Sequence, residues 1–263
     1  MGAPQPEEIY ERTEKEGERR LGRPFLELAS TAASAGIDVA FGLVALATVA
    51  HVLAKHFGED GAHFFGSIAF GIAFVFIVVG RSELFTENFL VPLAAFDRRD
   101  RLKWRKLAEL WTVSPLFNIL GGALLVVILS SHGVLPHGVG EPLVALADDL
   151  DRQGLTSAFL SAVAAGALIT LMTWMIEGMD QMGVRVAVAW IGGALLALGA
   201  FNHVVVVTLE ALFGIRYGAA MGWGDFAGNF FTAAAGNMVG GIGLVTLTRF
   251  TQARSGGGRS TSD

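Results

Sequence analysis

Long apolar runs constrain this chain more than any other feature, and a polar stretch interrupts one of them. Residues 64–79 read FFGSIAFGIAFVFIVV and residues 90–96 read LVPLAAF. The ten residues between them, GRSELFTENF, carry an arginine, two glutamates, a threonine and an asparagine. Because about 20 apolar helical residues cross the hydrocarbon core of a bilayer, these runs indicate a membrane protein. The polar interruption needs a separate explanation.

The composition supports an all-α membrane protein. Hydrophobic residues make up 52% of the chain and charged residues 16%, against roughly 25% charged residues in average soluble domains. The absence of cysteine excludes disulfides, thiolate metal sites and cysteine nucleophiles. The net charge of -5 gives no basic surface for nucleic acid. We therefore expect no nucleic-acid partner, no metal and no cofactor.

Six membrane spans are predicted within one transport domain, residues 25–250, and they lie near 26–54, 62–96, 103–131, 156–177, 184–213 and 226–250. Residues 1–24 are charged on most faces and contain no apolar signal-peptide core, which indicates an amphipathic segment on the cytoplasmic surface. Residues 251–263, TQARSGGGRSTSD, are predicted to form a disordered cytoplasmic tail.

The loops predict the orientation of the spans. Residues 96–106, FDRRDRLKWRK, are strongly basic, whereas the loop after the third span is acidic and carries Glu141, Asp148, Asp149 and Asp151. Positively charged loops stay on the cytoplasmic side. With six spans, both termini are then expected in the cytoplasm.

An internal repeat organises the chain. NILGGALLV at residues 118–126 matches NMVGGIGLV at residues 237–245, and the same spacing places GRSELFTENF opposite GAFNHVVVVT, residues 199–208. Each half holds three predicted spans, an odd number, so the second half enters the membrane in the opposite sense. The sequence therefore predicts a 3+3 inverted repeat with an interrupted helix in each half.

Both interruptions point to a pore. Charged residues and non-helical backbone are tolerated at membrane depth only where protein buries them or where they line a wet cavity. In inverted repeats, the N-termini of broken helices often meet near the midplane and favour an anion there. We expect these half-helices to begin near Thr86 and Val204, beside His203.

Four motifs carry a resemblance to the formate/nitrite transporter family: SELFTEN at 82–88, FNILGG at 117–122, FNHVVV at 201–206 and AGNMVGG at 235–241. Their order and spacing are similar to the family's over roughly residues 25–250. The resemblance implies an aquaporin-like protomer in a homopentamer of the inner membrane. It also implies a small weak-acid anion as substrate, such as formate, nitrite, hydrosulfide or lactate.

The resemblance also implies roles for individual residues. His203 matches the family's central histidine, and Thr86 matches the threonine that hydrogen-bonds it. Asn118 and Asn237 match asparagines that support the broken segments. The remaining expected pore residues are the constriction residues Phe70, Phe74 and Leu196, with Leu84, Phe85 and Asn202 beside the central pair. Each has a structural alternative: a packed histidine, a threonine helix cap, or phenylalanines of the core.

The other polar residues are expected to support the pore. Arg81 and Glu83 are expected to fix the broken loop, and Asp38 is either a pore residue or, preferentially, a salt-bridge partner of Arg81. Glu87 and Asn88 stand where the family has smaller residues. Asn202 stands where characterised members have glutamate. These departures leave the substrate open, because the extra carboxylates also suit a neutral or cationic solute.

We expect the anion to gain or share a proton at or near His203 and to cross the apolar constrictions largely as the neutral acid. Two alternatives stay open: an aquaporin-like channel for another neutral or cationic solute, and a structural or sensory membrane protein without transport. Enzymatic activity is not expected. The H-E-x-x-H pattern is absent, and no convincing oxyanion motif flanks Ser67.

Overall fold

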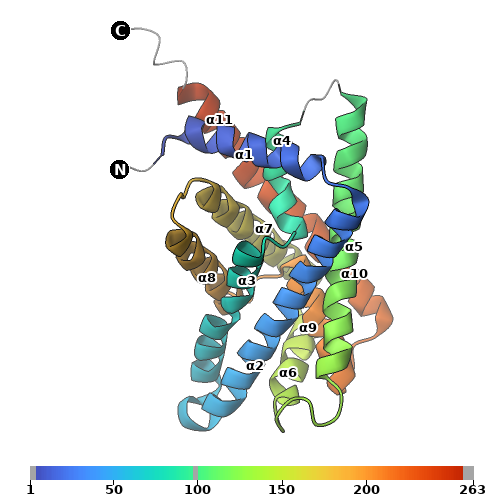
Figure 1. Ribbon diagram of the computed structural model, residues 1–263. Coiled ribbons are helices and arrows are strands. Elements are labelled where there is room, and N and C mark those ends of the chain that lie inside the picture. The colour runs from blue at the N-terminus through green and yellow to red at the C-terminus, as the bar shows by residue number, and fades with distance from the viewer. Residues whose placement is uncertain (1–3, 97–99, 257–263) are drawn as a thin grey trace.

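The computed structural model describes residues 4–96 and 100–256, which form helices and their connections without any β-strand (Figure 1). The elements in chain order are α1 (Pro6–Leu21), α2 (Phe25–Phe70), α3 (Ile72–Gly80), the 3₁₀ helix η1 (Phe85–Phe89), α4 (Val91–Ala94), α5 (Arg101–Leu129), α6 (Gly140–Arg152), α7 (Leu155–Glu177), α8 (Met182–Leu198), α9 (Val204–Tyr217), α10 (Trp223–Met238), the π-helix η2 (Val239–Thr246) and α11 (Leu247–Gly256). The all-helical class predicted from the sequence is confirmed for these residues.

Four helical segments are long and apolar enough to cross a membrane, namely Phe25–Gly80, Arg101–Leu129, Leu155–Glu177 and Trp223–Ser255, and a shorter apolar helix runs over Met182–Leu198. The first segment reverses direction at Gly58, whose φ of 69° lies in the left-handed region. Figure 1 shows the two arms of α2 running up and down beside one another. This segment therefore covers the first predicted span, 26–54, and residues 62–80 of the second.

The last span continues without a break from α10 through η2 into α11. The sequence predicted a disordered tail from Thr251, but residues 251–256 are the last turns of α11. That part of the prediction is wrong, because the helix hydrogen bonds persist past the apolar run. Residues 257–263 lie outside the described residues.

Glycines let the long helices touch backbone to backbone. A Cβ added to Gly36 of α2 would overlap the carbonyl oxygen of Asn118, and one added to Gly121 of α5 would overlap that of Ala33. Gly240 of η2 meets α7 in the same way. Small residues allow this close approach in membrane helices, and these contacts fix α2 against α5 and α7 against η2.

Both expected helix breaks are present. α3 ends at Gly80, and Arg81 follows with a left-handed φ of 56°; α8 ends at Leu198, and Ala200 has a φ of 46°. After the second break α9 begins at Val204, as the sequence predicted.

The first break differs from the prediction of a half-helix starting near Thr86. The chain forms only η1 and the four-residue α4. Pro92 provides the physical reason, because proline has no N–H for a helical bond to the carbonyl four residues earlier. That carbonyl belongs to Asn88, and it accepts a hydrogen bond of 3.0 Å from Trp111 Nε1 instead.

Two amphipathic helices close opposite ends of the bundle (Figure 1). α1 packs against α4, where Gly17 lies directly against the backbone of Val91. α6 packs against α9, where Ala147 lies against Gly214. α6 falls in the segment that the sequence analysis treated as a loop, and its buried Leu143, Ala147 and Leu150 form the stripe that holds it in place.

A candidate pore between two cavities

Two buried asparagines hold the two helix breaks with matching sets of hydrogen bonds. Asn118 Oδ1 accepts from the Phe85 N–H at 3.0 Å, while its Nδ2 donates to the carbonyls of Ala32 at 2.7 Å and Glu83 at 2.8 Å. Asn237 Oδ1 accepts from the Val204 N–H at 2.9 Å, and its Nδ2 donates to two carbonyls at 2.8 and 2.9 Å. Each asparagine thus pairs with one N–H and one carbonyl of a helix break, groups that have no helical partner there, and also ties the break to a continuous helix.

A histidine–threonine pair joins the two breaks. His203 Nε2 lies 2.6 Å from Thr86 Oγ1, and both side chains are fully buried. His203 is also the N-cap of α9, where its Nδ1 accepts from the Val206 N–H at 3.4 Å. With Nδ1 as acceptor, the ring proton of neutral His203 sits on Nε2 and is donated to Thr86. The hydroxyl hydrogen of Thr86 then has no acceptor among the described residues.

Large apolar side chains surround this pair. The Phe74 ring meets the His203 ring edge-on with centroids 6.4 Å apart, and Phe70 packs on Phe74 at 6.1 Å. Leu84 is fully buried, and Phe85 is 5% exposed and packs on Phe89. Of the predicted constriction residues, Phe74 therefore lies against His203 and Phe70 lies behind Phe74.

A cavity of about 310 Å³ lies on the α6 side of this pair, and we call it the α6 cavity. Its lining residues are Leu46, His63, Leu146, Asp149, Leu150, Arg152, Gln153, Leu196, Ala197, Ala200, Phe201, Asn202, Val206, Val207 and Glu210. Leu196, a predicted constriction, thus borders it. Asn202 Nδ2 donates to Gln153 Oε1 at 2.7 Å, which fixes the end of α6 to the second break.

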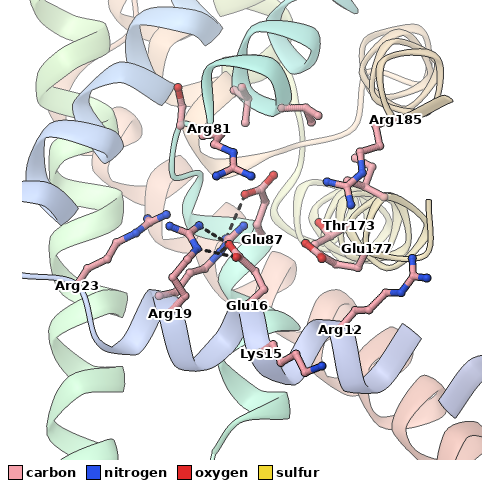
Figure 2. Close-up of a pocket in the computed structure, with 15 residues that line it drawn as sticks. Arg12, Lys15, Glu16, Arg19, Arg23, Arg81, Glu87, Thr173, Glu177 and Arg185 are labelled. Atoms are coloured by element: carbon pink, nitrogen blue, oxygen red, sulfur yellow. Dashed lines mark hydrogen bonds and ion pairs between the residues drawn. The ribbon is translucent and has the colours of Figure 1, made fainter. Parts of the chain in front are cut away.

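A second cavity of about 430 Å³ lies on the α1 side, and we call it the α1 cavity. It is lined by Arg12, Lys15, Glu16, Arg19, Arg20, Arg23, Ile77, Val78, Arg81, Ser82, Glu87, Thr173, Ile176, Glu177 and Arg185 (Figure 2). Cationic side chains outnumber carboxylates in this lining. Glu87 borders the α1 cavity and Asn202 borders the α6 cavity, so Thr86 and His203, which are adjacent to them in sequence, lie between the two cavities.

A buried ion cluster ties α1 to the first break. Arg20 Nη1 donates to Glu83 Oε1 at 3.1 Å, to Glu87 Oε2 at 3.2 Å and to Asn88 Oδ1 at 3.2 Å. Arg23 pairs with the other oxygen of Glu83. These charges are almost completely removed from solvent: Arg20 is 8% exposed, Glu87 is 5% exposed and Glu83 is fully buried.

Two predicted roles change in the structure. Asp38 does not pair with Arg81; its Oδ2 accepts from Ser82 Oγ at 2.7 Å. Arg81, whose backbone is left-handed, lines the α1 cavity, where Figure 2 shows its guanidinium above Glu87. Glu83 does fix the broken loop as expected, but through Arg20 and Arg23.

Sequence reasoning missed the arginines of α1, and it also missed Glu210. The available signal was a charge count: Glu83 and Glu87 at membrane depth require cations, and Arg81 alone cannot neutralise both. Glu210 was hidden because its neighbours on α9 are apolar and it lies outside the four motifs.

The α1 end of the cluster predicts a pH dependence. Burial alone would raise the pKa of Glu16, but the hydrogen bond from Arg19 and the charge of Arg20 lower it from 4.5 to about 2. A lowered pKa in the folded state stabilises the fold above the unfolded value, and this stabilisation is lost as the pH falls. We expect hydrogen-exchange protection of α1 to fall between pH 4.5 and about 2. In Glu16→Gln the Glu16 part of this decline should be missing, whereas equal pH profiles for both proteins would contradict the assignment.

The sequence matches the model of one protein family, described as formate/nitrite transporter, over residues 7–251. Among curated relatives, the inner membrane protein YfdC of Escherichia coli (strain K12) is 26% identical over 94% of this chain and 78% of its own length. The formate channel BtFdhC of Bacillus thuringiensis is 20% identical over 95% of this chain and 96% of its own.

A solved structure has the same fold. A pentameric formate channel with formate bound superposes with a TM-score of 0.73 at 21% identity, and the match covers 86% of this chain and 96% of that one. Such a score at low identity establishes the fold. Because the family model spans nearly the whole chain, including both helix breaks, this protein belongs to the formate/nitrite transporter family.

Proposed function

We propose that this protein is a membrane channel for small monovalent anions of weak acids, of which formate is the simplest. The observation that carries the proposal is the buried His203–Thr86 pair, which partitions two cavities that open at opposite ends of the bundle. An anion that reaches this partition meets hydrogen-bond donors within an otherwise apolar constriction.

The protomer we propose has six spans arranged as a 3+3 inverted repeat. Asn118 and Asn237 support this arrangement through their matching hydrogen bonds. Equivalent positions also line the two cavities, such as Ile77 and Leu196, or Arg81 and Ala200. By analogy with the pentameric formate channel, we propose a homopentamer with one pore in each protomer.

We place the α1 end of the molecule in the cytoplasm of the cell and the α6 end outside its inner membrane. The basic residues Arg101, Lys103, Arg105 and Lys106 begin α5 at the α1 end, whereas Asp148, Asp149 and Asp151 lie on α6. Positively charged loops face the cytoplasm. Arg98 and Arg99, which contributed to the sequence-based prediction, lie outside the described residues.

The α1 cavity supports an anion rather than a cation as the solute. Lys15 and Arg81 both line it, and neither has a carboxylate partner among the described residues. Arg185 Nε donates to the carbonyl of Met179 at 2.7 Å, and among the residues that the structure describes Arg185 has no ion-pair partner. Clefts lined by one sign of charge concentrate ions of the opposite sign. The cationic alternative would therefore require entry against an unfavourable potential.

Energetics favour passage of the partition as the neutral acid. Moving a bare carboxylate into an apolar environment costs several kcal/mol even after relaxation. Protonating an acid with a pKa of about 4.3 at pH 7 costs only about 4 kcal/mol. The hydroxyl of Thr86, which accepts the Nε2–H of His203, donates to an oxygen of the anion while the proton arrives from water in a cavity.

The His203→Ala variant tests the proposal. We expect formate uptake into proteoliposomes at about pH 7 to fall roughly tenfold or more, because a positioned donor at the partition is lost. His56→Ala serves as the matched control, since His56 is exposed beside the bend at Gly58 and should not affect flux. Full, pH-independent formate flux through His203→Ala would overturn the role of the histidine. Flux of a small cation without any flux of formate would overturn the anion channel.

A further inference from the structure

Glu210 places a carboxyl group on the route through the α6 cavity. It lies on α9 seven residues after His203, which is about 10 Å along the helix axis at 1.5 Å per residue. Its side chain is partly buried and lines the same cavity as Val206, Val207 and Leu196. A solute that moves between the α6 mouth and the partition passes this carboxyl.

No described residue gives the Glu210 carboxyl a hydrogen bond or an ion pair. From α6, Asp149 and Arg152 face the cavity but pair with each other at 2.5 Å near the mouth. From α2, His63 lies at the edge, where its Nε2 contacts the carbonyl oxygen of Leu198 at 3.2 Å. The other helices packed against α9, α5 and α10, contribute no charged side chain to the cavity within the described residues.

The unpaired carboxyl groups of the two cavities have different surroundings. On the α1 side, Glu16 and Glu87 pair with arginine, and Glu177, which has no ion pair among the described residues, shares its cavity with several cationic side chains. On the α6 side, the one arginine of the described lining, Arg152, is paired with Asp149, and Glu210 shares the lining with apolar residues such as Leu196. An ionised carboxylate without a cation would repel an incoming anion, so Glu210 cannot serve as an anion-attracting charge. Its chemistry suits a proton donor.

We propose that Glu210 is the proton-donating residue of the α6 cavity, a role that rests on the proposed anion channel. The O–H bond of the Glu210 carboxyl breaks as an O–H bond forms on the substrate carboxylate. The electron pair stays on Glu210, which becomes the carboxylate, and the substrate becomes the neutral acid that crosses the partition. A hydronium ion from the solution on the α6 side then returns the proton to Glu210.

Two physical properties fit a carboxyl group to this role. A glutamic acid side chain has an intrinsic pKa of about 4.3, similar to that of small carboxylic acids, so a proton passes between the two groups with little change in free energy. Two carboxylates close together in a poorly solvated site also retain one proton between them. Entry of the anion therefore draws one proton into the α6 cavity.

The test compares formate uptake by wild type, Glu210→Gln and Glu210→Asp in oriented proteoliposomes with the α6 side outward. Glutamine keeps the shape of the side chain but cannot donate this proton. We expect uptake by Glu210→Gln to be roughly tenfold lower at about pH 7. The difference should shrink at about pH 5, where more formate enters already protonated. Glu210→Asp keeps a carboxyl and should retain most of the wild-type rate.

Asp149→Asn is the matched control, because it removes an exposed carboxylate from the mouth of the same cavity and should leave the pH profile unchanged. Proton uptake on mixing the purified protein with formate in weakly buffered detergent gives a second readout. Wild type should take up one proton for each formate bound, and Glu210→Gln should take up clearly less. Equal uptake rates and pH profiles for wild type and Glu210→Gln would overturn the role of Glu210. Absence of formate flux in wild type would instead overturn the channel proposal.

Discussion

Replacing Arg20 with alanine should destabilise the protein by about 4 kcal/mol, because removal of one partner from a buried ion cluster leaves the other charges uncompensated. Arg20 contacts Glu83, Glu87 and Asn88 on the first helix break. Burial alone would lower the pKa of Arg20, but the negative charges of Glu83 and Glu87 raise it above its ordinary value. The guanidinium therefore stays charged. We expect the melting temperature in detergent to fall by about 10 °C.

Arg19→Ala is the matched control for this prediction. Arg19 is the preceding residue of α1, its side chain is 44% exposed, and its ion pair is with Glu16. Exposed pairs contribute about 0–1 kcal/mol, so this variant should melt close to wild type. Neutralising Arg20, Glu83, Glu87 and Arg23 together, with methionine for each arginine and glutamine for each glutamate, should recover much of the lost stability. A melting temperature of Arg20→Ala equal to that of Arg19→Ala would contradict the stabilising role of Arg20 in the buried ion cluster.

The Asn237→Ala variant should have an effect of similar size on the second break. The substitution leaves the Val204 N–H and the Asn202 carbonyl without their partners, while the Ala162 carbonyl keeps its hydrogen bond within α7. Each unsatisfied buried group costs about 1–3 kcal/mol, and the two together cost about 4 kcal/mol. Because these groups position His203, we expect little folded protein in detergent, and from the folded fraction little formate flux.

Two variants sharpen the measurement at this position. Asn237→Asp keeps the oxygen that accepts from Val204 but loses both donors, so its melting temperature should fall between those of wild type and Asn237→Ala. Asn229→Ala alters the same helix, α10, at a partly exposed site with no side-chain hydrogen bond to a described residue. It should behave like wild type. If Asn237→Ala and Asn229→Ala melted alike, the supporting role of Asn237 would be wrong.

Much of the fold follows from local sequence patterns. Apolar runs fixed the long helices, and polar residues within two of these runs marked both breaks. The family resemblance predicted that Asn118 and Asn237 support the broken segments, and the structure shows Asn118 at Phe85 and Asn237 at Val204. These features are predictable because each is determined by a short stretch of sequence. In lipid, backbone N–H and C=O groups without hydrogen bonds cost free energy, which limits the structures that such a stretch can form.

The features that sequence patterns missed depend on contacts between distant segments. The apolar stripe of α6 binds α9, a partner more than 50 residues later, so its hydrophobic pattern alone did not separate a docked helix from a loop. Arg20 reaches Glu83 across 63 residues of sequence. A glutamate within an apolar run indicates that a cationic partner exists. Which cation pairs with it depends on how α1 lies across the first break.

The glycine contacts of the fold have a consequence for how this protein can move. Where Gly36 touches the backbone of α5 and Gly240 touches that of α7, neither helix pair can slide without steric overlap. Each of these pairs lies within one half of the chain, so each half moves as a rigid unit. Collective motions of microseconds to milliseconds are thereby confined to movements between the halves. Within a half, only the rotation of single side chains such as Phe74 and Leu196 can change the width of the pore.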